Sequence, residues 1–384
     1  MRVLHVCGMY LPATEWGGPP FAVAGYADAV RRAGIDCEVF ATTARGAPGL
    51  PPIAAGTRDV DGIQVTYFPA ADGNRAMIAP AMLPALARRV RELDLVHTHM
   101  LWAFPGIVAD WAAILARVPY VVTPHGSLDP WALSQRKWTK RAFLAASERH
   151  TLLRAAFVHY TAEAERAQVP AWLRAVPSEI VPNVIDASQF APGDPAVRRA
   201  SREVLILGRI HVMKGFDVLI PAWREVAAAA PDARLVIAGP DEGGYRAEVE
   251  RLIAEAGVGS SVDFTGHLDE AGRADRLARA ALLVQPSFRE NFGMAVAEAM
   301  AAELPVVVSD RVNICDDITA ARAGLVVPRE PAPLARAILQ LLGDADARLA
   351  MGRAGRRLVS ERYAPDAVGA AMRAAYERAL TRRA

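Results

Sequence analysis

Short apolar runs alternate with longer amphipathic segments along the whole chain, and this alternation predicts strands joined by helices. Strands followed by helical connections favour parallel sheets covered by helices on both faces. The predicted strands are residues 3–6, 37–41, 63–67, 95–98, 120–123 and 156–160 in the first half, and 204–207, 235–238, 262–265, 282–285 and 306–309 in the second. The clearest predicted helices are residues 20–33, 83–92, 107–116, 137–153 and 366–383.

The alternation restarts after a cluster of Pro, Gly and Asp at residues 191–195, which predicts a domain boundary. A chain of 384 residues is also long for one domain. We therefore predict two Rossmann-like, doubly wound α/β domains, residues 1–185 and 186–365, facing a deep cleft. Ligands of such sheets bind beyond the carboxyl ends of the strands, so functional motifs should directly follow strands.

Composition excludes several classes of protein. The 44 basic and 42 acidic residues give a formal charge of +2, too small to predict nucleic-acid binding. The three cysteines are far apart and show neither metal-ligand spacing nor a disulfide framework. No apolar run approaches the roughly 18 residues of a spanning helix, and the N-terminus does not read as a signal peptide. We expect a cytoplasmic protein that could reach a membrane only from its inner surface.

The strongest motif follows the predicted strand 282–285 and reads Pro-Ser-Phe-Arg-Glu-Asn-Phe-Gly-Met-Ala-Val-Ala-Glu-Ala-Met over residues 286–300. A helix that begins after such a loop presents backbone N–H groups and a positive end to a phosphate or sugar oxygen. Gly293 allows a ligand to approach the backbone. Glu290 and Glu298 can each accept two hydroxyl donors, as the diols of a sugar and a ribose require. An ordinary capped helix is the alternative interpretation.

These two carboxylates are not expected to act as a glycosidase pair. Eight helical positions correspond to about 12 Å, whereas retaining hydrolases hold their carboxyl groups roughly 5–5.5 Å apart. Two separate binding roles for Glu290 and Glu298 are therefore favoured.

The second motif follows the strand 204–207 and reads Gly-Arg-Ile-His-Val-Met-Lys-Gly over residues 208–215. Arg209 offers a planar fork and Lys214 a point charge, a combination suited to a diphosphate. Both cations would neutralise a departing diphosphate without a metal ion. A solvated basic turn is the alternative.

Histidines follow two strands of the first half. His125 lies after the strand 120–123 and precedes a glycine, which allows a sharp turn that presents the ring to a ligand. His97 and His99 end the neighbouring strand, and of these His99 is the better candidate for lining the cleft. A structural role is an equally valid interpretation for both.

The loop after the first strand contains Gly17 and Gly18, directly before a predicted helix. Paired glycines at a helix N-terminus suit a phosphate or an acceptor group. Their spacing is not the dinucleotide fingerprint. The two D-x-D sequences, at residues 59–61 and 344–346, do not follow strands in this prediction, so we interpret both as solvated loops rather than metal ligands.

Together these motifs resemble the retaining GT-B glycosyltransferases of the family 4 type, which include bacterial mannosyltransferases and sucrose-phosphate synthases. The resemblance covers nearly the whole chain, and its most specific elements are the segments 290–298 and 208–215. Residues 123–131, 309–314 and 323–327 are similar to a subgroup that builds bacterial capsule and exopolysaccharide.

The resemblance implies a donor site in the second domain and an acceptor site in the first, to which the last helix (366–384) usually returns. It implies that Arg209 and Lys214 bind the donor diphosphate, Glu298 the ribose and Glu290 the sugar hydroxyls. The remaining implied contacts are Gly208, Gly239 and His267 around the nucleotide, the backbone of Asn291, Phe292, Gly293 and Met294 at sugar and phosphate, His125 at the sugar, and Gly17, Gly18 and His99 on the acceptor side.

The expected activity is retaining transfer of a sugar from a nucleotide-sugar, such as a GDP- or UDP-sugar, to a saccharide or polyprenol-linked hydroxyl. The nucleotide-sugar is a co-substrate, and neither a cofactor nor a metal is expected. A basic segment with tryptophans, residues 131–154, could contact anionic lipid; a solvated helix face is the alternative. Other possible functions are a sugar-nucleotide epimerase without an acceptor, an NAD-dependent oxidoreductase, which the missing fingerprint disfavours, and a silent nucleotide-sugar sensor.

Overall fold

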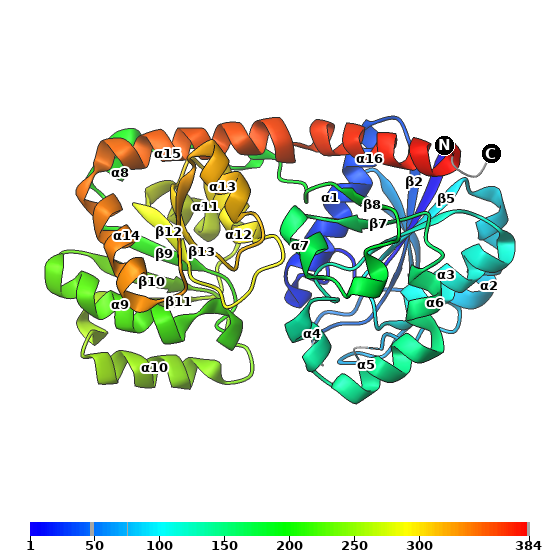
Figure 1. Cartoon of the computed structure of the whole chain (residues 1–384), viewed down its shortest axis with the longest axis horizontal. Helices are drawn as coiled ribbons and strands as arrows, with labels where there is room; N and C mark the ends of the chain where they lie inside the picture. Colours follow the sequence, from blue (N-terminus) through cyan, green and yellow to red (C-terminus); the bar gives the residue numbers. More distant parts are fainter. Residues whose placement is uncertain (47–49, 75, 382–384) are drawn as a thin grey trace. The chain divides into compact units, whose positions relative to one another are not determined.

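The computed structural model describes residues 1–46, 50–74 and 76–381, and the chain divides into two compact units (Figure 1). The first unit comprises Met1–Val184 and Pro365–Ala384, and the second comprises Ile185–Ala364. Each unit is an α/β domain built on its own sheet. The first unit thus contains both ends of the chain, and the second is inserted between them.

The first unit contains an eight-stranded sheet with the order β3-β4-β2-β1-β5-β6-β7-β8. All neighbouring strands are parallel except β3, which forms an antiparallel hairpin with β4. The strands are β1 (Arg2–Val6), β2 (Asp36–Thr42), β3 (Gly56–Val60), β4 (Ile63–Phe68), β5 (Leu95–His99), β6 (Tyr120–Thr123), β7 (Phe157–Tyr160) and β8 (Ser178–Ile180).

Alternate residues of these strands enter two different apolar cores, as the period of two requires. Val3 of β1 packs in the core beneath α1 and the C-terminal helix α16, whereas Leu4 packs in the core beneath α2, α3 and α6. The main helices are α1 (Gly18–Arg32), α2 (Met82–Arg89), α3 (Phe104–Ala116), α4 (Pro130–Ser134), α5 (Lys137–Phe143), α6 (Arg149–Leu152), α7 (Glu163–Gln168) and α16 (Pro365–Thr381).

The close approach of α16 to α1 depends on a small residue. A Cβ atom added to Gly369 of α16 would lie 2.2 Å from the backbone oxygen of Ala29 in α1. The backbones can therefore touch only where Gly369 has no side chain. Buried Met372 and Tyr376 continue the same face of α16 into the core. Of the helix predicted to residue 383, Arg382 and Arg383 lie outside the described residues.

The second unit contains a six-stranded, all-parallel sheet with the order β11-β10-β9-β12-β13-β14. Its strands are β9 (Glu203–Leu207), β10 (Arg234–Ala238), β11 (Val262–Gly266), β12 (Leu282–Gln285), β13 (Val306–Ser309) and β14 (Gly324–Val327). Its helices are α8 (Pro195–Ala200), α9 (Phe216–Ala229), α10 (Tyr245–Ala256), α11 (Glu270–Arg279), α12 (Met294–Ala301), α13 (Cys315–Ala321), α14 (Pro331–Gly343) and α15 (Ala345–Leu358).

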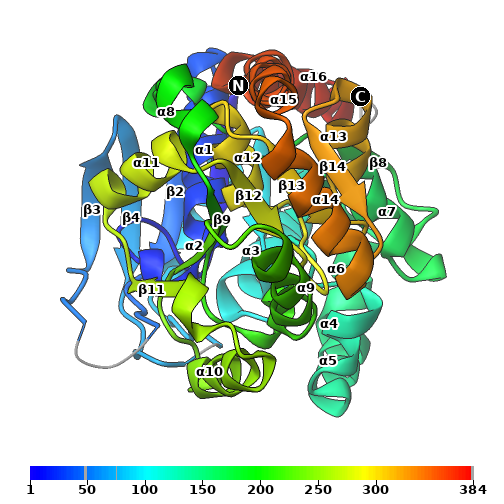
Figure 2. The same ribbon diagram turned by 90° about the vertical axis from the view of Figure 1, so that its left-hand side faces the viewer.

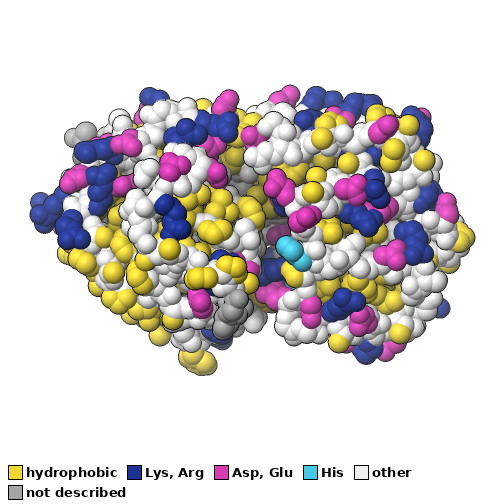
Figure 3. All heavy atoms as spheres, turned by 180° about the vertical axis from the view of Figure 1, so that it is seen from behind, with side chains coloured by type: hydrophobic (Ala, Val, Ile, Leu, Met, Phe, Trp, Pro, Cys, Tyr) yellow, Lys and Arg dark blue, Asp and Glu magenta, His cyan; other side chains and the backbone are white. Residues whose placement is uncertain are grey.

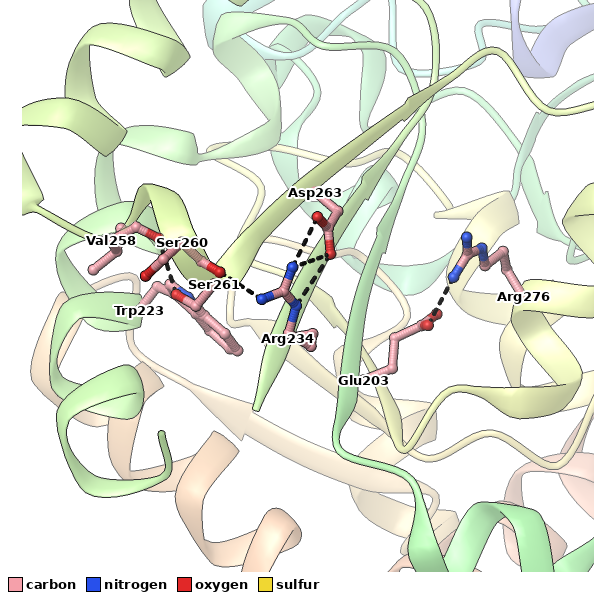
Figure 4. Close-up of polar contacts among 8 residues, drawn as sticks. All are labelled: Glu203, Trp223, Arg234, Val258, Ser260, Ser261, Asp263 and Arg276. Carbon is pink, nitrogen blue, oxygen red and sulfur yellow. Dashed lines mark hydrogen bonds and ion pairs between the residues drawn. The ribbon is translucent and has the colours of Figure 1, made fainter. Parts of the chain in front are cut away.

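Helices cover this sheet as well (Figure 2). The core beneath α9, α10 and α14 surrounds the fully buried Trp223, whose indole N–H donates to Ser261 Oγ at 2.9 Å. At the amino ends of the strands Arg234 of β10 pairs with Asp263 of β11, and Glu203 of β9 pairs with Arg276 (Figure 4). These ion pairs are partly exposed, so they contribute little stability compared with the apolar core.

The predicted fold class is confirmed, with three differences in detail. The strands β3, β8 and β14 were not predicted; all three lie at sheet edges, and β3 and β8 have only a weak apolar pattern. The predicted helix 137–153 is interrupted by a π-helical segment at Leu144–Glu148. The interpretation of residues 59–61 as a loop was wrong, because Asp59 lies in β3 and Asp61 in the hairpin turn that follows. Asp344, by contrast, caps α15 by accepting from the N–H of Ala347.

The charged side chains on the surface are mixed in sign, as the near-balanced composition predicts. On the face shown in Figure 3, basic and acidic side chains are interspersed among apolar ones. Among the described residues, no helix combines the length and apolar character needed to cross a membrane.

Candidate functional site

The strand order of the second unit reverses between β9 and β12, which lie side by side although two strands separate them in the sequence. Loops that leave adjacent strands at such a switch point diverge to opposite faces of the sheet and leave a crevice at the carboxyl edge. The loop after β9 contains the segment 208–215, and the loop after β12 contains the segment 286–293. The two strongest sequence motifs therefore flank the position where this fold class binds ligands.

These two loops are held together by backbone contacts. The N–H of Phe288 donates to the backbone oxygen of Met213 at 2.9 Å. Gly215 has a φ of 80°, and a Cβ atom at this position would lie 2.0 Å from the backbone oxygen of Pro286. Only glycine satisfies both the left-handed backbone and the close approach. Gly215 is thus needed for the two loops to touch.

The loop contact places Lys214 Nζ 2.6 Å from Glu290 Oε2. Both side chains are largely buried, with 19% and 22% of their surface exposed. The backbone of Glu290 is fixed in turn, since its N–H donates to Arg311 and its oxygen accepts from Asn313. The cation and the carboxylate are therefore preorganised at the same point, where an anionic ligand would compete with Glu290 for Lys214.

The N-terminus of α12 begins directly after Glu290. Gly293 is its N-cap residue with a φ of 85°, and Met294 is its first residue. Asn291 is partly buried, whereas the ring of Phe292 is buried against Tyr363 at a centroid distance of 5.1 Å. Phe292 therefore anchors the loop through its side chain. The separation of about 12 Å inferred for the carboxylates of Glu290 and Glu298 assumed a continuous helix between them. This assumption was wrong, because the segment is helical only from Met294 onward.

Glu298 lies in α12 and has a partner that the sequence does not reveal. Its two carboxylate oxygens each lie 3.2 Å from Nη1 of Arg273 in α11. Burial raises the pKa of Glu298, and the neighbouring Arg273 opposes this shift. The side chain is only 12% exposed, so a hydroxyl that reached it would meet a carboxylate already held in place.

The other predicted residues of this unit border the same edge of the sheet. Arg209 follows β9 and forms an exposed ion pair with Glu242 at 2.7 Å. Gly208 has a φ of 143°, and Lys214 lies beside it, because an added Cβ would be 3.3 Å from Lys214 Cε. Gly239 follows β10, and a Cβ there would lie 1.9 Å from the oxygen of Gly208. His267 follows β11 and is exposed.

The sheet of the first unit also reverses its order, between β1 and β5. The loop after β1 leads to Gly17, which has a φ of 85° and is the N-cap residue of α1, and Gly18 is the first residue of that helix. His99 ends β5 and His125 follows β6. The predicted residues of this unit therefore also lie at the carboxyl ends of its strands.

The histidines of this edge form a cluster. His125 has a left-handed backbone with a φ of 49° and a partly exposed ring, whose Nε2 lies 3.2 Å from Nδ1 of His99. His99 is 1% exposed and contacts His5 of β1, with 2.8 Å between His99 Nε2 and His5 Nδ1. His99 can therefore influence a ligand only through His125. His5 was not predicted as a member of this cluster; it lies within β1, away from the loop that follows the strand.

His5, His97 and His99 each offer a nitrogen within 4.8 Å of the other two, a grouping that could hold a metal ion. All of their nitrogens except Nε2 of His5 are engaged in hydrogen bonds, however. His97 contacts Tyr376 Oη and Thr123 Oγ1, both at 2.6 Å, and His5 contacts His99. We therefore interpret the cluster as a hydrogen-bonded network.

Comparisons with known proteins identify the family. Residues 191–358 match the family model described as "Glycosyl transferases group 1", and residues 17–184 match the "Glycosyl transferase 4-like domain". The alpha-D-kanosaminyltransferase of Streptomyces kanamyceticus is 30% identical over 294 residues, which cover 71% of this chain and 74% of the relative. The chain is a group 1 glycosyltransferase.

Two further similarities agree with this assignment. The 2-deoxystreptamine glucosyltransferase of S. kanamyceticus is 29% identical over 330 residues, or 80% of this chain and 83% of the relative. The structure of Anabaena HepE in complex with UDP and glucose superposes with a TM-score of 0.74 at 20% identity, covering 98% of this chain and 99% of HepE. The fold of this glycosyltransferase is GT-B.

The buried histidines predict how stability depends on pH. Burial lowers the pKa of His5 to about 3 and that of His159 to about 4. Folded histidines therefore stay neutral below pH 6.5, where unfolded ones take up protons. Stability is fully present above about pH 6.5 and falls as the pH decreases toward 4, by up to about 1.4 kcal/mol per pH unit for each group. Glu148, whose pKa burial raises to about 7, has the opposite effect.

The variant His159→Gln isolates one of these groups. Its melting temperature should be lower than that of the wild type at pH 7.5, and the difference should shrink at pH 5, because the variant no longer has that proton to take up. Scanning calorimetry at both pH values measures this difference. A difference that stayed constant or grew would contradict the assignment of a neutral, buried His159.

Proposed function

We propose that this glycosyltransferase transfers a sugar, with retention of anomeric configuration, from a nucleotide-sugar to a hydroxyl of a saccharide or lipid-linked acceptor. The observation that carries the proposal is the pair of Lys214 and Glu290 at the switch point of the second unit. One group binds anions and the other accepts hydroxyl donors, and a nucleotide-sugar offers both a diphosphate and a sugar.

In this proposal Lys214 releases Glu290 when the donor binds and turns to the diphosphate. Glu290 then accepts hydroxyl hydrogens from the sugar. Arg209 is well suited to assist, since its present ion pair with Glu242 is exposed and worth little. The N-terminus of α12 adds backbone N–H groups and a partial positive charge near Gly293. The Lys and Arg cations supply the stabilisation of the leaving diphosphate that a metal would otherwise provide.

The proposed step forms the bond between the acceptor oxygen and the anomeric carbon while the bond from that carbon to the diphosphate breaks. The proton of the acceptor hydroxyl passes to the leaving phosphate oxygen, on the same face of the sugar. This route needs no protein base. It is compatible with His125, whose pKa burial lowers to about 3 and which is proposed to contact the sugar.

The nucleotide is proposed to be UDP or GDP. HepE, a structural neighbour, was crystallised with UDP and glucose, and relatives of this chain include a glucosyltransferase and a GDP-mannose-dependent mannosyltransferase. Thermal-shift screening against UDP- and GDP-sugars identifies the donor, because a ligand that binds only the folded state raises its melting point. Gly17 and Gly18 are proposed to border the acceptor.

A membrane-bound acceptor would require a surface that contacts lipid, and the segment Trp131–Arg154 is the candidate. Trp138 is 76% exposed, and the guanidinium of Arg141 lies over its ring, 5.0 Å from the centroid. Its single acidic residue, Glu148, is 2% exposed and accepts from the N–H of Trp102. The exposed charge of the segment is therefore entirely positive, as anionic lipid would require. Its cations are Arg136, Lys137, Lys140, Arg141, Arg149 and Arg154.

Removal of either member of the ion pair should prevent transfer. Lys214→Ala and Glu290→Ala should each lower turnover by about 100- to 1,000-fold, as the loss of a group that stabilises the transition state does. Release of nucleotide diphosphate with and without an acceptor measures this loss and separates transfer from an epimerase reaction on the donor alone.

The double variant Lys214→Met/Glu290→Gln controls for folding. It leaves no unpaired charge, so its melting temperature should recover relative to the single variants while its turnover stays low. Arg251→Ala, which breaks an exposed ion pair on α10, should leave turnover unchanged. Near-normal turnover in both single variants would overturn the assignment of the site.

Glu298→Gln should mainly weaken nucleotide binding. A charged hydrogen bond to a ribose hydroxyl is worth about 1.5–3 kcal/mol, so the Kd for the nucleoside diphosphate should rise by roughly 10- to 100-fold. Titration calorimetry with UDP and GDP measures the change. An unaltered Kd for the nucleotide that binds the wild type would exclude the ribose role.

Membrane contact should depend on anionic lipid. The wild type should co-sediment with vesicles of phosphatidylglycerol but not with neutral phosphatidylcholine, and salt should weaken the binding. Trp138→Ala combined with Lys137→Glu should abolish it, whereas Arg251→Glu on the second unit should not. Equal sedimentation with both lipids, or with neither, would eliminate the membrane role.

A further inference from the structure

Three histidines of the first unit form a continuous line of contacts that begins at His125, in the loop after β6. His125 Nε2 lies 3.2 Å from His99 Nδ1, and His99 Nε2 lies 2.8 Å from His5 Nδ1. The ring of His99 meets both neighbours edge to edge, as hydrogen bonds in the ring plane require, with centroid distances of 5.5 Å to His125 and 5.1 Å to His5. We call this line the inner chain.

All three rings are neutral at physiological pH. Burial lowers the pKa of His5 and of His125 to about 3, and it lowers the pKa of His99 well below the usual value of 6.5. A neutral imidazole carries one hydrogen, so one of its nitrogens donates and the other accepts. Each nitrogen–nitrogen contact of the inner chain must therefore contain one hydrogen.

This requirement couples the three tautomers. If Nδ1 of His99 carries the hydrogen, it donates to His125 Nε2, and His99 Nε2 must accept from Nδ1 of His5. If Nε2 of His99 carries the hydrogen, both contacts reverse. The inner chain therefore has only two arrangements, in which all three hydrogens lie on Nδ1 or all three on Nε2.

The inner end of the chain distinguishes these arrangements. Nε2 of His5 is buried and has no hydrogen-bond partner within the described part of the chain. A buried N–H without an acceptor is rarer in proteins than an acceptor left without a donor. The arrangement with hydrogens on Nδ1 leaves only a bare lone pair at this end, so it is the favoured one.

A second line of contacts runs beside the inner chain and has the opposite direction. His159 Nε2 lies 2.7 Å from the backbone oxygen of Val181, which can only accept. His159 Nδ1 therefore accepts from Thr123, whose oxygen accepts from Nε2 of His97. His97 Nδ1 then accepts the hydroxyl hydrogen of Tyr376 in α16. This outer chain holds both of its histidines as Nε2–H tautomers.

We propose that His5 and His99 are positioning residues that hold His125 as the Nδ1–H tautomer, so that His125 donates a hydrogen bond to an oxygen of the bound sugar. Nδ1 of His125 is suited to this role because the ring is partly exposed and this nitrogen has no partner among the described residues. The identity of the oxygen rests on the proposed function. The tautomer itself does not, since it follows from contacts within the first unit.

Nitrogen NMR on the full chain, labelled with ¹⁵N-histidine, tests the tautomers directly. Long-range proton–nitrogen correlations distinguish Nδ1–H from Nε2–H in each ring. We expect Nδ1–H for His5, His99 and His125 and Nε2–H for His97 and His159. Observation of His125 as Nε2–H, or as a cation at pH 7, overturns the proposal, and it does so whether or not the protein transfers sugar.

Two variants test the coupling. His5→Phe keeps a buried aromatic ring but removes the donor to His99, so the His125 signals should change from one tautomer to a mixture. Transfer should fall about two- to tenfold, the usual worth of one hydrogen bond, with little change in the Kd for nucleoside diphosphate. Tyr376→Phe removes only the hydroxyl that contacts His97 in the outer chain, so it should leave the His125 signals unchanged. A His125 tautomer unaffected by His5→Phe would overturn the positioning role.

Discussion

The contact between the loops after β9 and β12 is the constraint on which the candidate donor site depends. It exists because two adjacent parallel strands deliver their loops to the same edge, and because Gly215 lets one backbone approach the oxygen of Pro286. Once the loops touch, Lys214 and Glu290 meet at 2.6 Å in a largely buried position. The two opposite charges hold the side chains of Lys214 and Glu290 in place when no ligand is bound. Two like charges would repel each other, and solvated side chains would be mobile, so neither would keep this geometry.

The first unit applies a different constraint at the equivalent edge. It buries four histidines next to the partly exposed His125, and burial keeps their rings neutral, so each buried ring must find both a donor and an acceptor or leave a polar atom unpaired. The result is two ordered lines of hydrogen bonds across β1, β5, β6 and β7. One line includes Tyr376 from α16, so a residue near the end of the chain takes part in the interior of the first unit.

The sequence predicted the central strands of each sheet well and the edge strands poorly. Central strands such as β6, β12 and β13 are short apolar runs buried on both faces, and the pattern alone gives their bounds. The edge strand β3 is largely exposed, and its residues Gly-Thr-Arg-Asp-Val give no apolar signal. Its pairing with β4 exists only because the hairpin turn at Asp61 and Gly62 returns the chain. A pattern of local hydrophobicity does not contain that information.

The sequence by itself determined the fold class, the two βα series and the segments that follow the strands, because each depends on residues close together in the chain. It also picked out Lys214, Glu290, Glu298 and His125. Only the tertiary structure decided their partners. Arg273 reaches Glu298 from another helix, and His5 reaches His99 across 94 residues of sequence. Charge balance, tautomer and pKa depend on these distances in space, and the folded sheets alone set them.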